Sequence, residues 1–217
     1  MSKDELLSHA GRLLTSAAAT DAAAAYGDDP VFPSDAVVEA PGDDETSFPG
    51  WEGEVLVLAY ENQGVCAWGL ALDGPSLGSV VVGGDLSCGE TTVVYAASLD
   101  DYLAARRWDR RCLEREPLLQ AQAGSVSSGV VDVLAGLGTS MVATSGWPYA
   151  DVRRFEIDDV LVMLWIDPEA CDWWISGSPE SVAALVPALV RSAGIGDDLW
   201  SNDDAGSQLL ADLDFGT

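Results

Sequence analysis

The chain has 217 residues, of which 48% are hydrophobic, so it can bury a sizeable core in one domain or in two small lobes. It carries 36 acidic and 10 basic residues, and its formal charge of -26 repels phosphate backbones and anionic membranes, which argues against nucleic acid or membrane as a partner. The same charge would attract a basic protein partner, or it simply keeps the chain dispersed in solution.

Neither the cysteines nor the histidine of the sequence indicates a metal or catalytic centre. Four cysteines lie far apart and form no C-x-x-C pair, which argues against a zinc module and a disulfide scaffold: Cys66, Cys88, Cys112 and Cys171. The one histidine, His9, falls in a predicted helix, where an exposed or half-buried structural position is expected. We therefore expect no metal, no cofactor and no catalytic residue of these types.

The beginning of the chain does not resemble a targeting segment. It carries Asp4 and Glu5 where a secretory signal has basic residues. No apolar run approaches the roughly 20 residues needed to span a bilayer. These features predict a cytoplasmic protein outside the membrane, and they carry no signal for an oligomeric state.

A helix and a proline-rich connection are expected in the first 53 residues. Leucines near helical spacing and a following Ala-rich stretch predict a helix over Lys3–Ala25. Gly27–Pro30 ends it, because glycine and proline do not continue a helix without cost. The connection from Val31 to Gly53 holds several prolines and acids, with one short strand expected at Ala36–Glu39.

The stretch Glu54–Leu72 predicts a β-hairpin. One apolar run reaches Tyr60, a second runs from Val65 to Leu72, and both are rich in residues that favour strands. The polar tetrad between them, Glu61-Asn62-Gln63-Gly64, indicates a presented surface more than a bare connector.

Two short strands and a helix are expected after the hairpin. The strands span Ser79–Val82 and Thr91–Ala96, with a turn at Gly83–Asp85 between them. Ser98 and Asp101 resemble a capping box, and the helix that they begin carries an apolar stripe and ends before Pro117. This helix region also holds five arginines, for which we expect an ion-paired face; a clamp for a carboxylate is the alternative: Arg106, Arg107, Arg110, Arg111 and Arg115.

The second half predicts further helices and strands. Helices are expected over Pro117–Ala123, Ser128–Leu137 and from Ser178 to about Arg191, the last with Pro187 as a kink. Strands are expected over Arg153–Ile157, Val160–Ile166 and Asp172–Ser176. From Asp197 onward the acidic tail is expected to be mobile or weakly docked, with a short helix near Leu209, Leu210 and Leu213.

This order of elements predicts an α+β fold, a mostly antiparallel sheet flanked by helices. We expect one domain over 1–217, with the hairpin and first helices in 1–117, strands and a helix in 118–196 and an acidic tail in 197–217. The acids of Asn202–Gly206 lack the spacing of an EF-hand loop and are expected to be solvated.

The hairpin sequence Tyr60–Gly69, YENQGVCAWG, resembles the ENQG-V-x-x-W-G core of the SUKH superfamily, which includes bacterial toxin-immunity proteins and relatives of fungal cell-wall-synthesis regulators. The segment from Ser98 to Leu103 is similar to the helix start of that family. The resemblance covers about Leu6 to Leu113 and departs from the family pattern after the hairpin, where only Pro75 remains of a P-P-x-V motif.

The resemblance implies a SUKH-like fold and a non-enzymatic domain that binds another protein, often a toxin. Glu61, Asn62 and Gln63 would supply polar contacts, Gly64 would permit the turn and Trp68 would anchor the hairpin to the core. Glu61 and Asn62 could equally brace the fold by hydrogen-bonding buried backbone. Two other functions stay open, a small acid/base hydrolase that uses Glu61 and a regulatory scaffold without a toxin partner.

Overall fold

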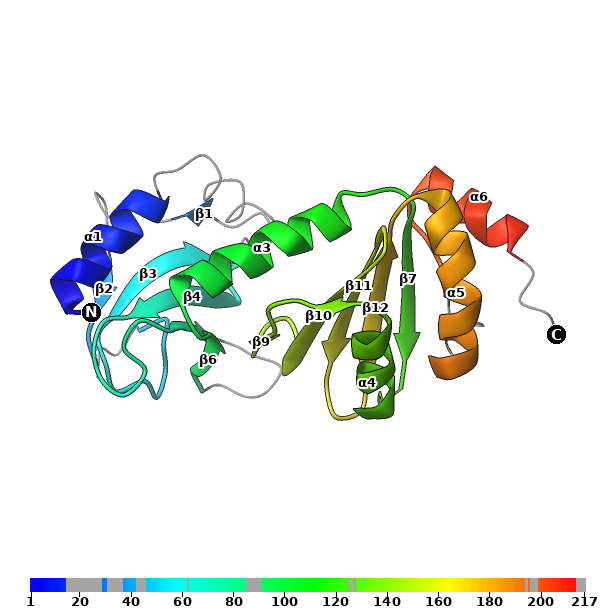
Figure 1. Ribbon diagram of the computed structural model, residues 1–217. Helices are drawn as coiled ribbons and strands as arrows, with labels where there is room; N and C mark the ends of the chain where they lie inside the picture. Colours follow the sequence, from blue (N-terminus) through cyan, green and yellow to red (C-terminus); the bar gives the residue numbers. More distant parts are fainter. Residues whose placement is uncertain are drawn as a thin grey trace. The chain divides into compact units, whose positions relative to one another are not determined.

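A computed structural model of the chain describes residues 1–14, 29–30, 37–41, 46–61, 63–84, 91–124, 126, 128–193, 195 and 199–213 (Figure 1). The chain divides into two compact units, one made of Met1–Arg110 with Thr144–Ala150, the other of Arg111–Ala143 with Asp151–Thr217. The boundary between them falls inside a helix that precedes Pro117. The single SUKH-like domain expected from the sequence stays a prediction.

The first unit contains an antiparallel sheet in the order β1-β3-β4-β5-β6, with β2 also paired to β3. Its strands are β1 (Asp29–Pro30), β2 (Val38–Glu39), β3 (Val55–Tyr60), β4 (Cys66–Ala71), β5 (Val80–Gly84) and β6 (Val93–Ala96). The predicted hairpin is confirmed as β3 and β4, whose register shifts by one residue between Val57 and Ala59. A shift of this kind bends the strand locally near its end.

One face of this sheet packs against two helices, α1 (Lys3–Leu14) and α3 (Leu99–Leu113) (Figure 1). The α1 side chains that reach the core lie at helical spacing, and they meet alternate residues of β3 and β4: Leu6, Ala10, Leu14, Leu56, Leu58, Trp68 and Leu70. The predicted N-cap residue Ser98 begins α3: its Oγ accepts from the Asp101 backbone N–H at 3.1 Å and donates to the Asp101 carboxylate at 2.7 Å.

The opposite face of the sheet is covered by the chain that leads into the hairpin, residues 46–53, here called the lead-in segment. Phe48 is 2% exposed and packs with Val55, Val57, Ala67 and Val81, while Trp51 lies beside this cluster. Both faces of β3 are therefore buried, which explains its continuous apolar sequence. Gly69 lies under the lead-in segment, where an added Cβ would overlap Val55 and the Phe48 ring.

The second unit contains an antiparallel sheet in the order β7-β12-β11-β10-β8. Its strands are β7 (Leu118–Ala123), β8 (Thr139–Ser140), β10 (Asp151–Ile157), β11 (Val160–Ile166) and β12 (Cys171–Ser176). Helices α4 (Ser128–Leu137) and α5 (Pro179–Ala193) cover one face, on which Trp173, Phe155 and Val162 are buried. The short β9 (Thr144–Ser145) belongs to the first unit. Antiparallel sheets with helices confirm the predicted α+β class.

One predicted helix is wrong. Pro117–Ala123 was expected to be helical, but Leu118–Ala123 forms β7 and pairs along its whole length with β12. Leu119 and Ala121 are buried on the face toward α5, so the side chains of this stretch follow the two-residue period of a strand. The expected turn at Gly83–Asp85 is also corrected, because Gly83 and Gly84 pair with Ala67 and Cys66 as the end of β5.

Residues 199–213 are docked on the second unit. Trp200 exchanges backbone hydrogen bonds with Gln120 of β7 at 2.8 and 2.9 Å. A helix follows, α6 (Asp204–Asp212), and the side chains of Leu209, Leu210 and Leu213 pack against the second core. The expected short helix is thus confirmed, and the expectation of weak docking is wrong for residues 199–213.

The other predicted elements agree closely with the structure where it describes them. Helix α4 has the predicted bounds and so does β11, while α5 starts after Ser178 as expected. The second half of the predicted first helix, residues 15–25, lies outside the described residues, as does Cys88. No helix in the described part of the chain is long and apolar enough to cross a membrane.

Candidate functional site

The tip of the hairpin is a tight turn closed by its own backbone. The Glu61 N–H donates to the Cys66 carbonyl at 2.9 Å, and the Gly64 N–H donates to the Glu61 carbonyl at 2.8 Å. Gly64 has φ 74°, a left-handed conformation that glycine adopts without strain. Its expected role of permitting the turn therefore has a physical basis in this backbone.

The Glu61 side chain faces its own turn. It is only 8% exposed, and its carboxylate accepts the Gln63 N–H at 2.7 Å. A carboxylate held by backbone in this way braces the turn, which was one of the two roles left open for Glu61. Gln63 and Gly64 are exposed, while Asn62 lies outside the described residues.

Trp68 lies in the core, with no exposed surface. Its ring packs edge-on against Tyr95 and Trp147, with centroids 6.1 and 6.4 Å away, and the guanidinium carbon of Arg106 lies 4.7 Å from its centroid. This environment fits the expected anchoring of the hairpin. It also places the indole out of reach of a partner, so any contact must come from other residues of the hairpin.

A hollow of about 420 Å³ lies beside the turn and is called the tip pocket here. It is lined by residues of the lead-in segment, the hairpin and the end of β5: Thr46, Ser47, Tyr60, Gly64, Val65, Cys66, Ala67, Gly83 and Gly84. Tyr60 pairs with Ala67 and is 37% exposed, so its ring is available at the edge of the pocket. Partial burial, helped by Glu39, raises the pKa of the Tyr60 hydroxyl, which stays a neutral hydrogen-bonding group.

Cys66 does not provide a nucleophile in the tip pocket. Burial raises the pKa of its thiol to about 12, and the negative charge of Glu61 adds to this effect. Because only the thiolate attacks, the group is inert near neutral pH. The described cysteines Cys66, Cys112 and Cys171 are all buried and form no disulfide.

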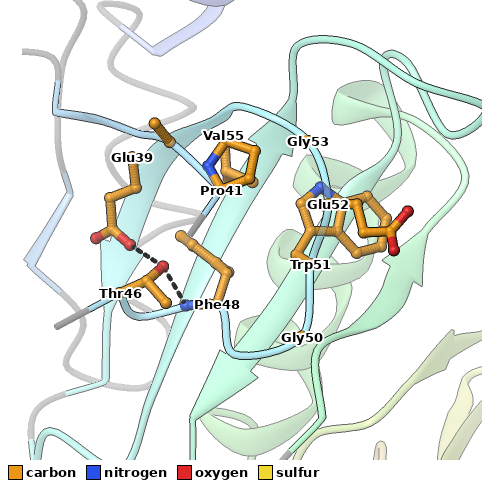
Figure 2. Close-up of a pocket in the computed structure, with 10 residues that line it drawn as sticks. Glu39, Pro41, Thr46, Phe48, Gly50, Trp51, Glu52, Gly53 and Val55 are labelled. Atoms are coloured by element: carbon orange, nitrogen blue, oxygen red, sulfur yellow. Dashed lines mark hydrogen bonds between the residues drawn. The ribbon is translucent and has the colours of Figure 1, made fainter. Parts of the chain in front are cut away.

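A second hollow, of about 540 Å³, lies on the same face of the sheet and is called the lead-in pocket (Figure 2). Its lining includes the lead-in segment and the chain just before it: Glu39, Ala40, Pro41, Thr46, Phe48, Gly50, Trp51, Glu52, Gly53 and Val55. The Glu39 carboxylate accepts from Thr46 Oγ1 at 2.8 Å, Ser47 N at 2.7 Å and Ser47 Oγ at 2.9 Å. These bonds position the start of the lead-in segment.

A third hollow, of about 420 Å³, shares Gly50–Gly53 with the lead-in pocket and is called the turn pocket. Asp73 and Ser76, from the connection between β4 and β5, form its other wall with Thr92. The Asp73 carboxylate accepts the Glu54 N–H at 3.0 Å, which ties the end of the lead-in segment to this connection.

None of the three hollows is lined by a lysine, arginine or histidine. The lead-in pocket and the turn pocket are lined by the carboxylates of Glu39, Glu52 and Asp73, whereas the lining of the tip pocket is uncharged. Carboxylates hold cations and hydrogen-bond donors, and they repel phosphate. Tyr60 lines the tip pocket, and Trp51 lines both the lead-in pocket and the turn pocket.

No protein-family model, curated protein or solved structure matches the chain. The similarity of Tyr60–Gly69 to the SUKH motif therefore stays a prediction.

The other candidates from the sequence have structural roles. Arg111 pairs with Glu156, and Arg115 pairs with Asp159 at 2.6 Å, which confirms an ion-paired face for these two arginines. His9 lies half-buried on α1, with Nε2 3.7 Å from the Asp100 carboxylate. In the described part of the chain, no cluster of three or more His, Cys, Asp or Glu side chains could hold a metal ion.

Sequence reasoning missed the lead-in segment as part of the site. The sequence predicts only a proline-rich connection here, yet Phe48 and Trp51 cover the sheet and line two of the hollows. The available signal was the pair of aromatic residues at spacing three within a polar segment. Such spacing in a long connection indicates a segment that packs on the domain.

Proposed function

We propose that this chain is a cytoplasmic, non-enzymatic protein-binding domain, similar to SUKH immunity proteins, whose partner is a basic protein such as a toxin. The observation that carries the proposal is the hollowed surface built by the hairpin tip, the lead-in segment and the β4–β5 connection, where every charged lining residue is acidic. The formal charge of -26 supports it, because a field of this sign speeds the encounter with a basic partner.

The composition of this surface also suits a protein interface. Tyr60 offers a large, half-open ring with a neutral hydroxyl, and such residues are frequent interface anchors. Gln63 offers an exposed amide at the turn next to it. The carboxylate of Glu61 is engaged with the turn backbone, which favours this binding role over acid/base chemistry at Glu61.

Affinity purification of the full chain from its native cells tests the proposal. We expect one basic protein to be recovered and to be lost with Tyr60→Ala or Gln63→Ala. The matched controls are Leu137→Ala, on the exposed part of α4, and Gln122→Ala, on β7, which should retain it. Expression of the recovered protein alone should slow growth, and co-expression of this chain should restore it.

Two results would overturn the proposal. One is recovery of no basic protein that depends on Tyr60 or Gln63. The other is a basic partner whose expression leaves growth unchanged with and without this chain, which would favour the regulatory scaffold over an immunity protein.

A further inference from the structure

We propose that the lead-in pocket holds the side chain of an arginine or lysine from the protein partner, with its charge between Trp51 and Glu52. This inference rests on the proposed function and adds the chemistry that the partner must present. Figure 2 shows Glu39 and Glu52 at opposite ends of the pocket, with Pro41 and Phe48 between them.

The apolar part of the pocket suits the methylene groups of a long basic side chain. Pro41, Phe48 and Val55 line it, and Phe48 and Val55 are fixed in the core at 2% and 1% exposure. Arginine and lysine commonly lay their methylenes along apolar surface while their charged ends stay near water. A purely apolar side chain would instead leave the carboxylates of this pocket without a counter-charge.

The two carboxylates of the pocket differ in availability. Both oxygens of Glu39 already accept hydrogen bonds from Thr46 and Ser47. Glu52 is exposed and has no hydrogen bond or ion pair within the described residues. Glu52 is therefore the open acceptor for a cation, while Glu39 contributes negative charge from the other end.

Trp51 supplies the second element of the site. Its side chain is half-buried beside the core cluster, so the indole is held in place, and its Nε1 has no hydrogen-bond partner in the described part of the chain. A cation over an indole face is attracted by the ring electrons, and a neighbouring carboxylate strengthens that preference. The same residue lines the turn pocket, where Asp73 adds a further carboxylate.

A peptide titration of the full chain tests the inference without the natural partner. The probe is Ac-Gly-Arg-Gly-NH2, and its control is the citrulline peptide, which has the same shape and no charge. Binding is followed by NMR through the Trp51 indole N–H signal, assigned with Trp51→Phe. We expect the arginine peptide to shift this signal in a saturable way and the citrulline peptide to leave it in place.

Variants separate the pocket from the general negative field. Glu52→Gln should weaken binding of the arginine peptide about threefold to fivefold, the upper part of the range for loss of an exposed ion pair. Glu169→Gln, an equal charge change in the exposed turn between β11 and β12, should alter the affinity by less than about twofold.

Three results would overturn the inference: equal weakening by both variants, no selective shift of Trp51, or equal binding of the citrulline peptide. A natural partner that still depends on Tyr60 and Gln63 would then leave the proposed function standing. If the arginine peptide binds selectively but affinity purification recovers no basic partner, the pocket is retained as a cation site and the proposed function is rejected.

Discussion

At the scale of single residues, several acidic side chains of this chain accept hydrogen bonds that hold loops in place, a role that composition alone does not reveal. Glu61 is bound to the Gln63 N–H, Glu39 to Thr46 and Ser47, and Asp73 to the Glu54 N–H. Each of these carboxylates satisfies backbone or hydroxyl donors in a connection that has no regular secondary structure. A high count of acids is therefore not equivalent to a uniformly solvated surface.

Replacing Glu61 tests its bracing role. Glu61→Ala should lower the free energy of unfolding by about 1 kcal/mol, because the partly buried Gln63 N–H loses its acceptor. Glu61→Gln keeps a carbonyl acceptor and should cost less. Urea denaturation measures both values, and equal stability of the wild type and Glu61→Ala would contradict the bracing role.

At the scale of elements, the side chain of Asp203 joins the start of α6 to β7. Asp203 caps α6 by accepting the Gly206 N–H at 2.6 Å, and it also accepts the Leu118 N–H at 2.9 Å. Burial raises the pKa of Asp203, but hydrogen bonds from Gly206, Leu118 and Ser201 outweigh it and leave the pKa below the ordinary value. The ionised form is therefore the one that holds the two elements together.

Asp203→Ala should weaken the attachment of the start of α6 to β7. We expect a loss of about 1 kcal/mol from the cap and faster hydrogen exchange at Gly206 and Leu118, with α4 amides as the internal control. Asp203→Asn, which can still cap, should lose less. Because the folded-state pKa is lowered, this stabilisation is present above the ordinary pKa and is lost as the pH falls through the folded value. Unchanged exchange in Asp203→Ala would contradict this role.

The elements also show which parts of the fold were accessible from the sequence. Helix α4, strand β11 and the β3–β4 hairpin were predicted because propensity, apolar spacing and turn residues agreed there. β7 was mispredicted, since LLQAQA fits a helix by propensity and a strand by alternation, and only its pairing with β12 decides between them.

The candidate site was only partly predictable. The tip residues Glu61, Gln63 and Gly64 stand out as a polar interruption of an apolar stretch, and a local pattern of this kind is visible in a sequence. The packing of Phe48 and Trp51 on the sheet is not local, because their partners Val57 and Val81 come from separate strands. The hollows that these contacts create could not be predicted from the spacing of residues in the sequence.

At the scale of the whole molecule, the charge of -26 opposes the compact state through self-repulsion. Ion pairs such as Lys3 with Glu54 and Arg115 with Asp159 offset little of it, because the chain has only 10 basic residues for 36 acids. The predicted consequence is a protein whose stability depends on ionic strength more strongly than that of a balanced chain.

Raising NaCl from roughly 0.05 M to roughly 0.5 M should increase the melting temperature, on the order of 3 °C for each kcal/mol of relieved repulsion. Calorimetry at constant pH and protein concentration measures the shift. The rise should level off once the screening length falls below the spacing of surface charges. A melting temperature that falls with added salt would show that the ion pairs outweigh the repulsion.

Gly69 has a consequence for recognising this surface in other chains. Trp68 fills the helix-facing side of β4. On the other side, Gly69 has no side chain and so leaves the space that Phe48 and Val55 occupy. A strand that carries any larger residue after the tryptophan would displace the aromatic cover, even with every other hairpin residue unchanged. We therefore expect a Trp-Gly pair, together with an aromatic residue about twenty positions upstream, to mark hairpins whose second face carries such a cover.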